Sequence, residues 1–154
     1  MLRKLFTKKF VIAALGAALA LFVLIQFIPM GNVYGQDPIL NEPPWDSAQT
    51  RALAKRACFD CHSNETEWPW YAKVQPMAFM ISRDVEAGRA LMNFSEWKEK
   101  TFITADLIEK MIRSDQMPLP RYLLAHPGAK LSDAEKETLI EGIRETLKYQ
   151  QNLR

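Results

Sequence analysis

The chain has 154 residues, enough for one compact domain with a core of its own and an anchor or linker beside it. The formal net charge is +2, but four basic residues at positions 3–9 precede every acidic residue, so without them the net charge is −2. Nucleic-acid binding needs a basic face, and this balance gives no support for a nucleic-acid partner. The only two cysteines lie three residues apart, a spacing too short for a disulfide framework that staples a fold.

An apolar run near the N-terminus predicts a membrane anchor. Residues 10–28 contain one polar residue, Gln26, and a helix of that length covers roughly 28 Å, close to the ~30 Å thickness of the hydrocarbon layer. We therefore assign residues 10–29 to an uncleaved transmembrane helix. A cleaved signal peptide is the alternative, although its apolar stretch is shorter, about 7–15 residues. The four basic residues precede the span and the next one is Arg51, so we expect residues 1–9 in the cytoplasm and the rest of the chain outside.

The translocated part divides into a linker and a domain. Residues 30–45 are rich in proline and glycine and predict a linker, whereas residues 46–150 are expected to form the domain. Within this domain, residues 63–76 and 114–130 are expected to be loops, because both carry several polar residues and prolines.

Four helices are predicted in the domain. The first begins at Asp46 as N-cap and ends near Cys58, and the second covers residues 77–91 at helical spacing of apolar positions. Thr104 can cap the third, and the capping box of residues 132–135 begins the last. No strand-like alternation of useful length occurs, so we expect an all-α, cytochrome c-like domain of about four helices after one transmembrane helix.

The residues Cys58, Cys61 and His62 form the C-x-x-C-H pattern of c-type haem attachment. Two thiols at this spacing can each add to one vinyl group of a haem, and the next residue can place an imidazole beneath the iron. We therefore expect one covalent haem c. A thioredoxin-like thiol pair lacks its strand–helix context here, and a structural zinc site would need a fourth ligand, for which His126 is the remaining strong nitrogen donor.

Three possibilities exist for the sixth iron ligand. Met117 is the first choice, because it lies in a proline-rich loop in which Pro118 and Pro120 could hold a thioether in place. His126 is the rival and would give bis-histidine ligation, and an open sixth position is a third possibility. Met77, Met80 and Met111 fall on helix stripes, where packing is enough to explain them.

Aromatic residues follow the C-x-x-C-H motif closely. Trp70 and Tyr71, together with Trp68, are expected to wall the haem pocket, although ordinary core or membrane-interface packing would also explain them. The carbonyl of Pro69 or Pro76 could accept a hydrogen bond from the outer nitrogen of His62.

Taken together, several runs resemble the small haem-binding domain family of bacterial c-type cytochromes. These runs are LIQFIP (24–29), CFDCHSNETEWPWY (58–71), RDVEAGR (83–89), NFSEW (93–97) and MPLPRYLLAHPGAKLS (117–132). The resemblance implies one haem domain tethered to a bacterial inner membrane and exposed to the periplasm, with Cys58, Cys61 and His62 as attachment and proximal residues. It supports Met117 less firmly, because the H-P element of the family falls on His126-Pro127.

Electron transfer is the favoured function, with redox proteins in or at the membrane as partners and with the bilayer itself contacted through residues 10–29. A thioether-ligated, six-coordinate iron has no open site for a substrate, so we do not expect an enzyme, and peroxidase-like activity least of all. A haem-based gas or redox sensor, or an accessory haem subunit of a larger complex, is the alternative.

Overall fold

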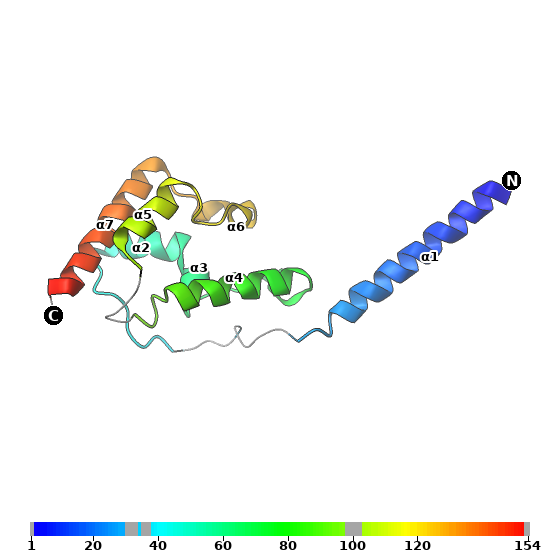
Figure 1. Cartoon of the computed structure of the whole chain (residues 1–154), viewed down its shortest axis with the longest axis horizontal. Helices are drawn as coiled ribbons and strands as arrows, with labels where there is room; N and C mark the ends of the chain where they lie inside the picture. Colours follow the sequence, from blue (N-terminus) through cyan, green and yellow to red (C-terminus); the bar gives the residue numbers. More distant parts are fainter. Residues whose placement is uncertain (1, 30–33, 35–37, 98–102, 153–154) are drawn as a thin grey trace. The chain divides into compact units, whose positions relative to one another are not determined.

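The computed structural model describes residues 2–29, 34, 38–97 and 103–152 (Figure 1). The chain consists of two compact units, Met1–Tyr34 with Trp68–Arg83 and Gly35–Glu67 with Asp84–Arg154. Within the described residues, every regular element is a helix, and strand pairing is confined to one isolated bridge between Asn41 and Glu96. The all-α prediction is therefore confirmed.

The first unit contains the long helix α1 (Leu2–Ile25). Its stretch Thr7–Ile25 has a mean hydropathy of 2.2 and contains no buried residue, and the helix is long and apolar enough to cross a membrane. Residues 26–28 continue as a tighter turn in which each amide donates to the carbonyl three residues earlier. The unit also holds the short 3₁₀ helix η2 (Trp70–Lys73) and the first half of α4 (Met77–Leu91).

The second unit holds the remaining helices and the core. Its elements are the end of α4 together with α2 (Ala48–Ala57), α3 (Phe59–His62), α5 (Ala105–Arg113), α6 (Pro120–Ala125), η3 (Pro127–Ala129) and α7 (Asp133–Asn152). Helices α2 and α5 pack against α7 (Figure 1). The buried core comprises Leu53, Ala54, Ala57, Phe59, Met92, Phe94, Trp97, Ile112, Leu131, Leu139, Ile140 and Ile143. Full burial of each large apolar side chain contributes about 1.5–3 kcal/mol, so this cluster is the main source of stability.

Side-chain caps explain where three of these helices begin. Thr104 Oγ1 accepts a hydrogen bond from Leu107 N at 3.2 Å, as predicted. Ser132 and Glu135 form the predicted capping box, with Ser132 N donating to Glu135 Oε2 at 2.8 Å. Helix α2 differs from the prediction, because its N-cap is Ser47 and not Asp46.

Two segments predicted to be loops contain short helices. Residues 114–130 include α6 and η3, and residues 63–76 include η2. Pro120 occupies the first turn of α6, where its missing amide hydrogen costs nothing. These helices escaped prediction because three to six residues are too few to develop a helical apolar period.

The C-terminal part of the predicted linker is hydrogen-bonded to the second unit. Leu40 N donates to Ser95 O at 2.9 Å, and Trp97 N donates to Asn41 O at 2.8 Å. Residues 30–33 and 35–37 of the linker lie outside the described residues. Residues 38–45 of the predicted linker therefore belong structurally with the second unit.

Candidate functional site

The C-x-x-C-H motif lies at the junction of two helices. Cys58 ends α2 by donating its amide to Ala54 O at 2.8 Å, and its own carbonyl accepts from Cys61 N at 3.2 Å and His62 N at 2.9 Å. Cys58 is thus both the C-cap of α2 and the N-cap of α3. This tight turn places two thiols and an imidazole within five consecutive residues.

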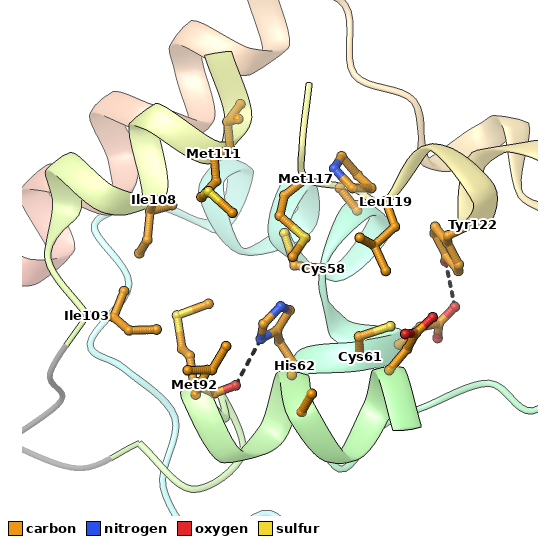
Figure 2. A pocket seen from close by; sticks show the side chains of 18 of the residues that line it. Cys58, Cys61, His62, Met92, Ile103, Ile108, Met111, Met117, Leu119 and Tyr122 are labelled. Atoms are coloured by element: carbon orange, nitrogen blue, oxygen red, sulfur yellow. Dashed lines mark hydrogen bonds between the residues drawn. The ribbon is translucent and has the colours of Figure 1, made fainter. Parts of the chain in front are cut away.

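The three side chains border a cavity of about 360 Å³ within the second unit (Figure 2). That volume falls within the range of small-molecule pockets, about 300–1,000 Å³, and most of the lining is apolar. Apolar lining residues come from several helices and include Ala57, Ala87, Leu91, Met92, Phe94, Ile103, Leu107, Ile108, Met111, Ile112, Met117, Leu119 and Ile143. Such a lining suits a large, flat, apolar ligand.

His62 is held by the backbone at the end of α4. Its Nδ1 lies 3.1 Å from Met92 O, and because a carbonyl only accepts, Nδ1 carries the hydrogen and Nε2 keeps its lone pair. Burial lowers the pKa of His62 and so favours the neutral ring, while backbone hydrogen bonds at Met92 and Gly88 oppose the shift. Pro69 and Pro76, the expected acceptors, do not fill this role; Met92 does.

Gly88 allows α4 to lie directly against α3. A Cβ atom at this position would be 2.3 Å from Cys61 O and 3.0 Å from the carbonyl carbon, both of them backbone atoms. Only a residue without a side chain permits this approach. The C-x-x-C-H motif and α4, which ends one residue before Met92, are consequently in direct backbone contact.

Met117 is presented by a turn at the end of α5. Asp115 adopts a left-handed conformation with φ of 54°, its amide donates to Ile112 O at 3.2 Å, and Gln116 N donates to Met111 O at 3.0 Å. This is the Schellman arrangement, with aspartate where glycine is usual. Met117 N also donates to Met111 O, at 3.1 Å. Figure 2 shows the side chain of Met117 on the cavity, facing the ring of His62.

Comparison with known families identifies the family of the chain. The sequence profile described as "Haem-binding domain" matches residues 20–145, most of the chain. The chain belongs to the haem-binding domain family. Comparisons with curated proteins and with solved structures found no match.

The residues of this haem-binding domain fit a haem. Two free thiols, an imidazole whose Nε2 is not engaged by Met92, and a thioether all border one apolar cavity. Burial raises the pKa of Cys58 and of Cys61 to about 12, whereas a redox-active thiol pair needs a lowered pKa. Among the described residues, no group of three or more His, Cys, Asp or Glu side chains could hold a metal ion by itself, so the zinc alternative finds no support.

One edge of the cavity is polar. Tyr122 Oη donates to Asp60 Oδ2 at 2.6 Å, and Arg121 forms a two-point ion pair with Asp84, at 2.5 and 3.1 Å. Burial, followed by the hydrogen bond to Asp60, raises the pKa of Tyr122. None of these four residues was predicted as a site residue, although the polar pair Arg121-Tyr122 inside an apolar segment is a signal that could have pointed to them.

The remaining predicted site residues lie elsewhere. The ring of His126 stacks on Tyr122 with centroids 4.2 Å apart, and its Nδ1 is 3.2 Å from Tyr122 O; the cavity lining includes Met117 but not His126. Trp70 and Tyr71 belong to the first unit, where their rings meet edge to face at 5.7 Å, and Trp70 is exposed. Their role as pocket walls stays a prediction.

Proposed function

We propose that this haem-binding domain is a mono-haem c-type cytochrome, anchored in a bacterial inner membrane, that carries electrons on the periplasmic face. The observation that carries the proposal is the meeting of four side chains, Cys58, Cys61, His62 and Met117, around one apolar cavity. Cys58 and Cys61 are the two cysteines of the chain, so they are its one pair of thiols.

The side chains have separate roles in this proposal. The Cys58 and Cys61 thiols would each add across one vinyl group, sulfur to one carbon and hydrogen to the other, so that the haem is held covalently. Nε2 of His62 would bind the iron, in an orientation held by Met92 O, and the sulfur of Met117 would bind the opposite side. The haem supplies a one-electron couple, and the apolar lining keeps water from it.

An electron carrier fits this cavity better than an enzyme does. If His62 and Met117 both held the iron, no iron position would remain for a substrate. The charged and phenolic groups at the polar edge are paired with each other, Arg121 with Asp84 and Tyr122 with Asp60. A peroxidase-like reaction needs acid–base groups that are available at an open iron, so this pairing supports a carrier.

The location rests on α1 and its flanking charges. The helix can cross a membrane, and four basic residues precede the apolar stretch whereas the next basic residue is Arg51. This asymmetry supports a cytoplasmic N-terminus and a periplasmic haem domain. The electron donor and acceptor would then be proteins in or at the same membrane.

The test is to purify the full chain from a host that matures cytochromes c. We expect a red protein with one haem per chain in a pyridine assay, and haem staining of its band in a denaturing gel. Replacing both thiols, Cys58→Ala with Cys61→Ala, should abolish the stained band, while His126→Ala should retain it. Colourless wild-type protein, or a stained band in the double variant, would refute the covalent assignment.

Carbon monoxide separates the carrier from the alternative, a gas or redox sensor. The reduced carrier should show no rapid spectral change with carbon monoxide, because both axial positions are filled. Rapid binding would favour the sensor.

A further inference from the structure

The first unit carries an exposed apolar surface that the haem site does not use. We call it the Trp70 face, and it consists of Trp70, Met77, Phe79 and Met80. Their exposed fractions are 79%, 42%, 53% and 44%. The opposite side of α4 is buried at Ala78 and Ser82, which are 0% and 4% exposed. Core packing therefore does not explain Met77 and Met80, contrary to the expectation from their helical spacing.

The Trp70 face is tied to the end of the membrane helix. Gln75 N donates to Gln26 Oε1 at 3.0 Å, and Gln26 Nε2 reaches Gln75 O at 3.4 Å, so the two residues form a reciprocal pair. Gln26 follows α1 directly and is the one polar residue in the apolar run of residues 10–28. Gln75 lies two residues before the start of α4. The hydrogen bonds thus place the apolar face beside the end of the span.

A second contact ties the same segment to the chain that follows α1. Tyr34 Oη donates to Ala72 O at 2.6 Å, and the rings of Tyr34 and Trp68 lie 4.5 Å apart. Residues on both sides of Trp70 are therefore held near the chain that leaves the membrane helix.

The composition of this face suits the boundary between lipid and water. Tryptophan and tyrosine concentrate there, because one side of the ring is apolar and the other end is polar. Lys73 and Arg83 are exposed beside the apolar residues, and the Arg83 guanidinium lies 5.7 Å from the centre of the Phe79 ring. Exposed cations next to exposed apolar side chains match a surface of lipid headgroups above acyl chains.

We propose that the Trp70 face inserts into the headgroup region of the bilayer that α1 crosses, on the side where α1 ends. The partner is the lipid itself, and the inference rests on the proposed membrane anchoring. The Trp70 face is exposed, apolar and aromatic, and the nearby Gln75 is hydrogen-bonded to Gln26 at the end of α1. The face therefore lies at the depth of the lipid headgroups. The segment from Trp70 to Arg83 then acts as a second, interfacial attachment.

The experiment uses the full haem-loaded chain in nanodiscs, with the photo-crosslinking residue p-benzoylphenylalanine at one position at a time. Phe79 and, separately, Met80 test the face. Leu15, exposed on α1, reports the span, and Leu124, an 87% exposed apolar residue of the second unit, is the matched control. Haem absorbance identical to wild type establishes that each variant has folded. After illumination, intact-mass spectrometry counts phospholipid adducts.

We expect phospholipid adducts at positions 15, 79 and 80, with yields at 79 and 80 at least about tenfold above that at 124. Adducts at 15 with background yields at both 79 and 80 would overturn the inference and leave the anchor intact. A protein adduct in place of lipid at 79 and 80 would overturn it as well. Absence of lipid at position 15 would refute the anchoring on which the inference rests.

Discussion

Replacing Gly88 with alanine should damage the domain at the contact between α3 and α4. The new Cβ would lie 2.3 Å from Cys61 O, a backbone atom that cannot rotate away, so the two helices must separate by about 1 Å to restore normal contact. Overpacking of this kind costs up to about 3 kcal/mol, and alanine gains about 1 kcal/mol over glycine in helix propensity. We therefore expect a net loss of about 2 kcal/mol in the free energy of unfolding.

The assay is thermal unfolding of the haem-loaded protein, followed by circular dichroism of the helices and of the haem. For a domain of this size the loss corresponds to a Tm lower by about 8 °C. The haem signal should also change before unfolding, because moving α4 lengthens the 3.1 Å contact between Met92 O and His62 Nδ1. Gly128→Ala is the control, since open space surrounds that glycine. A Tm at or above the wild-type value for Gly88→Ala would refute the reasoning.

Three further substitutions test other parts of the structure. Met117→Ala should leave the haem attached but give a high-spin iron that binds carbon monoxide, whereas Met111→Ala, which also lines the cavity, should keep the wild-type spectrum; the opposite pattern would move the ligand to Met111. Leu139→Ala removes a fully buried core side chain and should cost about 2–5 kcal/mol in a denaturant titration, and a loss below about 1 kcal/mol would contradict the core assignment. Hydrogen bonds from the Ser132 backbone, and then from the side chains of Arg56 and Ser132, lower the pKa of Glu135 to about 2. The ionised Glu135 therefore stabilises the fold fully above its unfolded pKa, and this stabilisation is lost as the pH falls through about 2. Glu135→Ala should accordingly lower the Tm at pH 7, with a difference that shrinks towards pH 2; a difference independent of pH would argue against the ionised capping box.

Local signals predicted the helix boundaries well where a single residue decides them. Thr104 has no equally good cap beside it, Ser132 is marked by Glu135 three residues later, and the structure uses both as caps. Asp46 and Ser47 are adjacent and almost equally good caps, so the sequence could not choose between them. Helix α4 was predicted over residues 77–91, which are its bounds in the structure.

Long-range contacts are the part that the sequence could not supply. Every residue has a carbonyl, so nothing in the sequence marks Met92, 30 residues after His62, as its hydrogen-bond acceptor. Helical spacing is the same on a buried and on an exposed stripe, which is why Met77 and Met80 were assigned to packing. Gly88 did carry a signal, since an isolated glycine inside a helical pattern often marks a close backbone approach.

The turn after α5 affects more than the course of the chain. Each electron exchange requires the surroundings of the iron to rearrange between two charge states, and a ligand that is already held in place lowers that barrier. In the proposed carrier, the main chain of Met117 is clamped to a carbonyl at the end of α5, a helix that itself packs on α7. Asp115, exposed and outside the cavity, creates this clamp through its left-handed conformation. A substitution there would alter the speed of electron exchange without touching the cofactor.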